Sequence, residues 1–310
     1  MYLRRWTAAV QPPMEPFVYV YRRGQTDPER RAPTNLAWER GLYAVDPRAA
    51  DDGDPEVAEK ALSAIEHHAR RAFAYIDAHG ALDSRPHILA MSNFLAVFVL
   101  RTRKGLLSLE QRMQRMAETF PEEYIESQGG IDAVIDQLRR RGVKSDELTA
   151  EKVTDAARRA ARRIATNREF RIQRVFGTGG KVAGVLQQMN WCVVNTEFRA
   201  KFITCDAPVL VPEEGEGKTW WEAPGVGFAT LGAEVWFTLD PDRAVVASFK
   251  PLPRHDTLPA HHVQQINEWL AHASLEFVVC HRGRPQIAKL MAGLRPIDVS
   301  LPPPQDRPNM

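Results

Sequence analysis

The sequence predicts an α+β protein, in which a helical middle region packs on a mixed, mainly antiparallel β-rich part formed by the N- and C-terminal regions. Three observations lead to this prediction. Short β-type runs open the chain, apolar residues then recur with the helical period of 3.6, and β-type runs return after Asn190. Of the 310 residues, 44% are hydrophobic and 26% are charged, which is enough apolar material for one substantial core.

We expect a single domain over residues 1–295. It would comprise N-terminal strands over 1–50, a helical region over 54–190 and a β-rich region with two helices over 191–295. Five prolines fall within residues 296–310, and this composition predicts a disordered tail.

The first strand is expected at 17–21, between Pro16 and the turn signal of residues 22–24, and a second short run lies at 41–45. The first helix follows, because apolar residues from Ala58 to Ile76 share one helical face. Asp54 is the expected N-cap of this helix, with Pro55 in its first turn.

More helices are expected at about 86–103, 106–119, 130–141, 149–176 and 181–190. The segment from Gly177 to Lys181 resembles part of a phosphate-binding loop. The motif's first glycine is replaced by Val175, however, and its final Ser or Thr by Val182, so a linker that ends a helix explains the glycines better. After Asn190 the pattern predicts strands at 191–194, 201–204, 235–239, 244–248 and 275–279, and helices near 260–273 and 284–293.

The composition of the sequence indicates in which cellular compartment the protein is expected. The start of the chain has no apolar core of a secretory signal, and the longest uncharged run, 86–100, is shorter than the roughly 18 residues of a membrane span. Three widely spaced cysteines, Cys192, Cys205 and Cys280, favour reduced, packed thiols. We therefore expect a cytoplasmic protein with no membrane partner.

The net charge of +2 indicates no particular partner, but the helical middle is basic, with 18 Lys and Arg against 12 Asp and Glu over residues 101–181. Arginines recur there at helical spacing, including Arg159 and Arg163. Such a stripe could follow the phosphates of a nucleic acid, or it could be an ordinary solvated face.

Other features admit two interpretations each. Asp206 ends a strand and precedes Pro208, an arrangement that displays an acid in a cleft or makes a turn. The acidic loop 212–227 carries Trp220 and Trp221, which could contact a partner or pack on the body. Adjacent histidines at 67–68 and 261–262 diverge on a helix, so surface or structural roles are favoured over metal binding.

In order and spacing, several blocks of the sequence resemble the bacterial domain-of-unknown-function 4238 family as far as about residue 282. The blocks are Tyr2–Trp6, Val18–Tyr21, Gly41–Asp46, Glu59–Glu66, Leu100–Arg103, Phe202–Val209, Phe237–Asp242 and Ile266–Asn267. The resemblance implies an α+β protein of unassigned activity. One departure is that the family's histidine-containing stretch before the first block has no counterpart here, so either the true start lies upstream or this member lacks that histidine.

The residues carried over from the family blocks are Arg4, Glu59, Glu66, Arg101, Thr204, Asp206, Pro208 and Asn267. Glu59 and Glu66 share a helical face, and together with Asp206 they could hold a divalent cation such as Mg²⁺. In the other interpretation, Arg101 pairs with one of the glutamates and locks the helical middle to the β part.

Two functional hypotheses follow. The first is a metal-dependent phosphodiester hydrolase, in which Glu59, Glu66 and Asp206 bind the metal and the basic helix holds a nucleic acid or another phosphate-bearing ligand. In this first hypothesis the residues that contribute to binding are Arg4, Arg101, Thr204, Asn267, Arg159 and Arg163. The second is a non-catalytic binding or regulatory protein that contacts a protein or nucleic-acid partner through the arginine stripe or the tryptophan loop.

Overall fold

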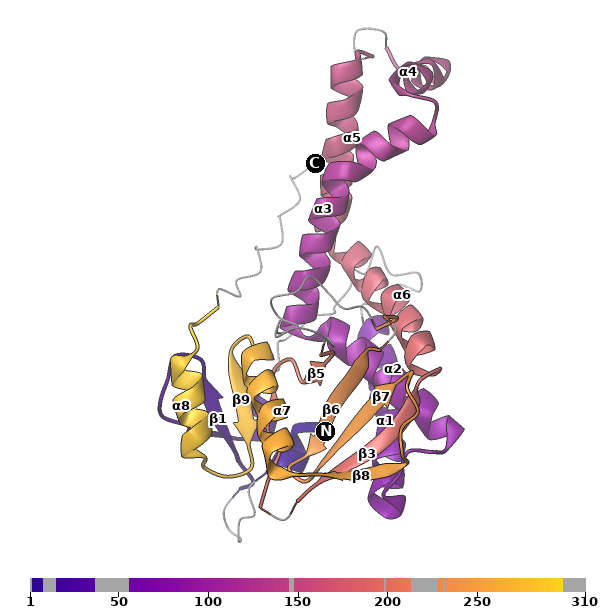
Figure 1. Ribbon diagram of the computed structural model, residues 1–310. Coiled ribbons are helices and arrows are strands. Elements are labelled where there is room, and N and C mark those ends of the chain that lie inside the picture. The colour runs from indigo at the N-terminus through magenta and orange to yellow at the C-terminus, as the bar shows by residue number, and fades with distance from the viewer. Residues whose placement is uncertain are drawn as a thin grey trace.

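The computed structural model describes residues 2–7, 15–36, 56–144, 148–197, 199–212, 228–230 and 232–297 (Figure 1). Four sequence predictions lie outside these residues: the strand at 41–45, Asp54 as an N-cap, the tryptophan loop, and most of the proline-rich tail. The first described residues form a short 3-10 helix, η1 (Tyr2–Trp6), and another, η2 (Pro33–Asn35), follows the first strands.

Two sheets confirm the α+β prediction and its mainly antiparallel pairing. The smaller sheet has the order β2-β1-β9-β4, with every pair antiparallel. Its strands are β1 (Val18–Arg22), β2 (Glu29–Arg31), β4 (Thr204–Cys205) and β9 (Phe277–Cys280). Pairing of β1 with β9 joins the two ends of the described chain, Tyr19 lying opposite Cys280.

The larger sheet has the order β5-β6-β7-β3-β8, in which only β3 and β8 run parallel. Its strands are β3 (Asn190–Thr196), β5 (Val209–Leu210), β6 (Glu234–Asp240), β7 (Arg243–Ser248) and β8 (His255–Leu258). Val193 and Phe237 of this sheet are fully buried. The sheet therefore supplies one wall of the main core.

Three helices supply the other wall: α1 (Val57–His79), α2 (Arg85–Arg101) and α6 (Arg168–Leu186). Their apolar residues, such as Phe73, Leu95 and Leu186, belong to the same core as the strands. Helices α7 (Ala260–Ala273) and α8 (Pro285–Gly293) contact the smaller sheet. In the described part of the chain, every helix is too short or too polar to cross a membrane.

Helices α3 (Arg103–Ser127), α4 (Ile131–Arg140) and α5 (Ala150–Thr166) form an arm that extends away from both sheets (Figure 1). The arm has small apolar clusters of its own. One, at its tip, joins Ile125, Val134, Ile135, Leu148 and Val153. The other joins Met113 and Ala117 of α3 to Ala165 of α5. The arm is therefore held by local packing rather than by the main core.

Two single-residue joints connect the arm to the body. Thr102 separates α2 from α3, and its Oγ1 accepts a hydrogen bond from the N–H of Gly105 (3.1 Å). Asn167 separates α5 from α6, and its Oδ1 accepts from the N–H of Phe170 (2.9 Å). A Cβ on Gly105 would lie 2.1 Å from the carbonyl oxygen of Val99, so only glycine allows α3 to leave α2 at this angle.

The predicted boundaries of the middle helices were partly wrong. The expected helix at 149–176 is divided at Asn167, where the capping side chain starts a new helix. The glycine segment expected to be a linker lies inside α6 instead. A Cβ on Gly179 would lie 3.3 Å from the Val97 side chain of α2, so this glycine serves close packing of the two helices. Similarly, α3 continues to Ser127, well beyond the expected end at 119.

Candidate functional site

Asp206 follows β4 and binds the turn between α7 and β9. Its carboxylate oxygens accept hydrogen bonds from the N–H groups of Leu275 (2.9 Å), Glu276 (2.6 Å) and Phe277 (3.4 Å). Burial raises the pKa of Asp206 to about 6, although these three donors favour the charged form. Asp206 therefore anchors a turn that lies about 70 residues later in the chain, a role that neither interpretation of the Asp-x-Pro pattern included.

Two cations face the same turn at the C-terminal end of α7, where carbonyl groups are left without helical partners. A guanidinium nitrogen of Arg23 donates to the carbonyls of Ala271, His272 and Ser274 at 2.9 to 3.3 Å. Lys104 Nζ donates to the carbonyl of Ala273 at 3.1 Å, and burial lowers the pKa of Lys104 to about 8. The surroundings of Asp206 are thus occupied by the protein's own backbone and cations.

Glu66 lies elsewhere, in an ion pair with Arg101 at 2.6 Å. This pair joins α1 to α2, and about a quarter of each side chain remains exposed (28% and 24%). The guanidinium of Arg101 also covers the ring of Phe98, 4.9 Å from its centroid. The pair therefore connects two helices with each other and does not connect the helical region to a sheet.

The predicted metal site is not present among the described residues. No group of three or more His, Cys, Asp or Glu side chains in that part of the chain could hold a metal ion, and Glu59, Glu66 and Asp206 are all included in it. The physical reason is that Arg101 binds Glu66, backbone amides bind Asp206, and Glu59 is exposed to solvent on α1. The structure thus offers no ligand set for Mg²⁺ from these three residues.

Thr204 and Asn267 make buried internal contacts. The Tyr2 hydroxyl donates to the carbonyl of Thr238 (2.6 Å), so the Thr204 hydroxyl, 2.6 Å away, donates to Tyr2. Asn267 Oδ1 accepts from the N–H of Ile203 (2.8 Å) and Nδ2 donates to the carbonyl of Lys201 (2.9 Å). Both residues therefore fix the segment that leads into β4. Pro208 is buried just after it.

Arg4 is exposed, whereas its neighbour Arg5 takes part in a charge network that the sequence did not reveal. Arg5 and Arg243 both contact Asp77 and Asp240, at distances of 2.6 to 2.9 Å. The two guanidinium groups lower the pKa of Asp77 to about 2. The network ties η1, α1 and the β6–β7 hairpin together. The 3-10 turn of η1 decides that Arg5 rather than Arg4 points inward, and the apolar periodicity of the sequence does not predict this turn.

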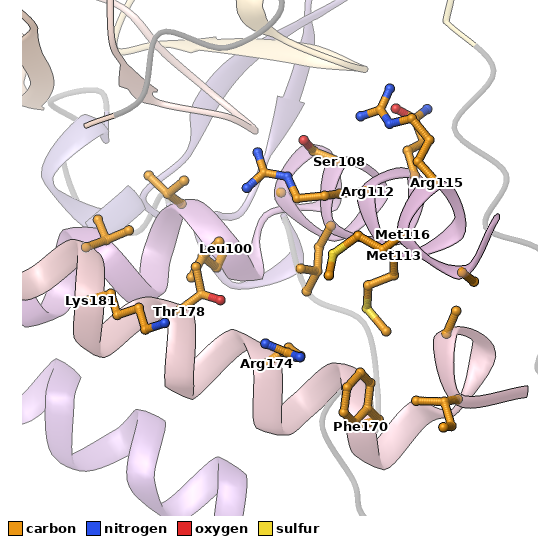
Figure 2. A pocket seen from close by; sticks show the side chains of 18 of the residues that line it. Leu100, Ser108, Arg112, Met113, Arg115, Met116, Phe170, Arg174, Thr178 and Lys181 are labelled. Atoms are coloured by element: carbon orange, nitrogen blue, oxygen red, sulfur yellow. The ribbon is translucent and has the colours of Figure 1, made fainter. Parts of the chain in front are cut away.

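A groove of about 1510 Å³ runs between α3, α5 and α6 and ends near β5. Its large apolar lining residues are Met113, Met116, Phe120, Tyr124, Ile164 and Phe170. Figure 2 shows Met113 and Met116 of α3 pointing toward the α6 side, where Phe170, Arg174 and Lys181 follow one another along the helix. The groove lies where the arm meets the body.

Most of the large apolar side chains that the structure describes as exposed gather in this groove. Among the described residues, the large apolar side chains classed as exposed are Met116 (49%), Phe120 (52%), Tyr124 (47%), Ile164 (52%) and Ile297 (42%). All but Ile297 line the groove. Because such side chains normally scatter singly over a surface, their concentration makes the groove the candidate functional site.

Within the described part of the chain, the charged residues that line the groove are all cations: Lys104, Arg112, Arg115, Arg174 and Lys181. The predicted binding residues Arg159 and Arg163 are exposed on α5 but do not line it. The groove was not predicted from the sequence, because the helix that forms one of its walls was expected to end at 119 and continues to Ser127. The available signal was the spacing of Met116, Phe120 and Tyr124, which puts three apolar side chains on one face of a longer helix.

Comparison with known proteins gives one match. The model of the family described as "Protein of unknown function (DUF4238)" matches residues 1–284, which include both sheets, the arm and the groove. Among curated proteins nothing matches, and no solved structure matches either. Since the match covers most of its length, this chain belongs to the DUF4238 family.

Proposed function

We propose that this protein is a binding protein that holds a segment of a partner macromolecule in the groove between α3, α5 and α6. One observation carries the proposal: Met116, Phe120, Tyr124 and Ile164 each expose about half of their surface, and all four line the same groove. Keeping apolar surface in water costs roughly 25 cal/mol per Å². A ligand that covers these side chains recovers that free energy.

The contacts of the predicted catalytic residues favour binding over hydrolysis. Asp206 and Glu66 are held by backbone amides and by Arg101 respectively, and neither residue lines the groove. The groove instead combines apolar and cationic side chains, which are the residue types of a recognition surface.

A second candidate is single-stranded nucleic acid, which the cationic lining favours. Nucleic-acid grooves combine basic side chains that follow the phosphates with aromatic rings on which bases stack. Here Arg112, Arg174 and Lys181 supply the charge, and Phe120 and Phe170 supply rings. The exposed Arg159 and Arg163 would extend the basic surface along α5.

We place this binding in the cytoplasm on the basis of the cysteines. Cys192, Cys205 and Cys280 are buried free thiols, and burial raises the pKa of each. Reduced, unreactive thiols suit a reducing compartment.

The groove is tested with 8-anilinonaphthalene-1-sulfonate, a probe that is both apolar and anionic. We expect Met116→Ser, Phe120→Ser and Ile164→Ser each to weaken the fluorescence increase on binding, and the triple variant to abolish it. The matched control is Ile297→Ser, which removes an exposed apolar side chain outside the groove and should leave the signal unchanged. Because about half of each altered side chain is exposed, each single variant should lose only about 1 kcal/mol of unfolding free energy, about half of what a fully buried apolar side chain contributes.

Two results would contradict the proposal. One is undiminished probe binding by the triple variant, which would place the probe elsewhere. The other is a loss of about 3 kcal/mol of stability for Phe120→Ser, because a loss of that size is typical of a core residue rather than of a free surface. Fluorescein-labelled oligo-dT and oligo-U of 20 nucleotides test the second candidate. It fails if neither oligonucleotide binds at 50 mM salt, where phosphate contacts are strong.

A further inference from the structure

Resting on the groove as the binding site proposed above, we propose that its occupant is an acidic amphipathic α-helix of a partner protein. Such a helix would turn an apolar face to the groove floor and carry Asp or Glu on both flanks. Three properties of the groove carry this inference: its size, the pattern of its apolar residues and the sign of its charges.

The size of the groove suits a length of helix better than a small molecule. Its volume is about 1510 Å³. Small-molecule sites usually have about 300 to 1,000 Å³. A helix about 10 Å across fills 1510 Å³ over a length of about 19 Å, which corresponds to about 13 residues.

The apolar pattern suits a helical partner. Met116, Phe120 and Tyr124 stand at positions i, i+4 and i+8 of α3, so they form a ridge about 12 Å long. Helix α5, which packs against α3, lines the groove with Ala157, Ala160 and Ala161, whose small side chains let another backbone approach closely. A ridge beside a shallow alanine surface is a geometry into which a third helix packs.

The charges specify what the flanks of that helix carry. Arg112 and Arg115 belong to α3, Arg174 and Lys181 belong to α6, and no Asp or Glu is among the described residues that line the groove. Figure 2 shows Arg174 and Lys181 on the α6 side and Arg112 and Arg115 on the α3 side. Since cations lie on both walls, acidic residues on both flanks of an occupant would be complementary to them.

The same charges argue against a second copy of this chain in a two-fold symmetric contact. Such a contact would place each groove against its own counterpart and bring the arginines of one copy against those of the other. The lining is only partly aromatic. Phe120, Tyr124 and Phe170 offer rings on which a base could stack, but Met113, Met116 and Ile164 offer none, so the lining as a whole suits apolar side chains better than bases.

The experiment measures fluorescence anisotropy of three labelled 18-residue peptides with the full chain. The first has Leu at i, i+3, i+4 and i+7 spacing and Glu at flanking positions. The second replaces every Glu with Lys. The third keeps the composition of the first but scrambles the order of Leu and Glu. We expect the first peptide to bind about 10-fold more tightly than either of the others. The preference over the Lys peptide should shrink as salt is raised, whereas the preference over the scrambled peptide, which has the same charge, should persist.

Charge reversal provides a readout that folding alone does not alter. The double variant Arg112→Glu with Arg174→Glu should bind the acidic peptide about 10-fold more weakly, because each partly exposed ion pair is replaced by a repulsion. The same variant should bind the Lys peptide more tightly, because repulsions are replaced by ion pairs. The control, Arg282→Glu with Lys289→Glu, makes the same change in net charge at exposed positions in and before α8. It should leave the preference intact.

Three outcomes would overturn the inference. Equal binding of the acidic and Lys peptides would contradict the inference that the occupant is acidic. Equal binding of the ordered and scrambled peptides would contradict the inference that it is an amphipathic helix. The absence of peptide binding at 100 μM would contradict both. In each case, probe binding that still depends on Phe120 would leave the groove standing as a binding site, so failure of this inference is distinct from failure of the proposed function. Displacement of the acidic peptide by oligo-U would assign the groove to nucleic acid.

Discussion

Asp206 shows how one side chain can satisfy a whole turn and still be electrostatically unfavourable. Three N–H groups point at its carboxylate, yet burial raises its pKa from 3.8 to about 6. The native state therefore binds the proton more tightly than the unfolded chain does. The stability that Asp206 contributes is fully present below about pH 3.8 and is lost as the pH rises through about 6.

We predict that in Asp206→Asn the free energy of unfolding no longer falls through ionisation of residue 206 as the pH rises from 4 to 6, because the amide does not ionise. The variant should also be less stable at pH 7, by about 1 to 3 kcal/mol, since an amide oxygen accepts fewer of the three N–H groups. Urea unfolding of both proteins from pH 4 to 8 measures both effects. His281, whose pKa burial lowers to about 4, acts in the opposite direction, so the informative quantity is the difference between variant and wild type. Asp155→Asn, at an exposed position, is the control. A difference that stays constant with pH would show that Asp206 does not titrate in this range.

At the scale of single residues, the sequence identified side chains that make specific contacts, but it did not predict which partners they contact. The Asp-x-Pro pattern correctly placed Asp206 at the end of a strand, but the amides that it binds lie about 70 residues later in the chain. Glu66 and Arg101 were expected either to join a metal site or to form a pair, and the choice depended on how α1 and α2 align. Contacts over such separations are set by packing, on which local spacing carries no information.

At the scale of elements, α7 is joined to the segment before β4 through one amide side chain. Asn267 satisfies one backbone donor and one backbone acceptor of residues 201–203, and it is buried. The backbone N–H of Ile203 would have no acceptor if this side chain were lost, and a buried group of that kind is costly.

We predict that Asn267→Ala destabilises the fold by about 1 to 3 kcal/mol through these two lost bonds. Gln264→Ala, one turn earlier on the exposed face of α7, should change stability by less than about 0.5 kcal/mol. Chemical denaturation at pH 7 compares them. If the two variants lose equal stability, the effect of Asn267 comes from the helix itself and not from its link to residues 201–203.

Helices with a regular apolar face were predicted well, whereas breaks between helices were not. The periodicity gave α1, α2 and α7 to within a few residues. The division between α5 and α6 depends on one capping residue, Asn167, in a stretch whose apolar pattern continues on both sides. The glycines of α6 misled the analysis because helix packing and chain termination select the same residue.

At the scale of the whole molecule, apolar burial is divided between a large core in the body and small clusters in the arm. Regions with few buried contacts open more easily than the core that carries global stability. The cluster at the tip of the arm, around Val134 and Ile135, is the clearest case.

We predict that Ile135→Ala opens the arm without unfolding the body. Hydrogen exchange should accelerate in α4 and in the adjacent ends of α3 and α5, while β3, β6 and β7 stay protected. Leu95→Ala in the main core is the comparison, and it should lower protection in α2 and the sheets by an amount corresponding to about 2 to 5 kcal/mol. Uniform acceleration in both variants would show that the arm and body form one cooperative unit.

The fold class could be predicted from the order of periodicities along the chain, but the arrangement of the strands could not. The pairing of β1 with β9 joins residues about 260 positions apart, and β3 pairs with both β7 and β8. The arm was equally invisible, since helices that leave a body and helices that cover it share the same apolar spacing. For the groove, the sequence predicted helices over much of α3, α5 and α6, but not the part of α3 beyond residue 119, the break at Asn167 or the arrangement of the three helices around one hollow.

The joints at Thr102 and Asn167 give the arm a mechanical property. Each is a single residue whose own side chain caps the start of the next helix, so the chain passes between body and arm without an intervening loop. The groove spans these joints, with α3 and α5 on one side and α6 on the other. A ligand that fills the groove therefore touches the arm and the body together, and its binding would oppose any movement of one against the other.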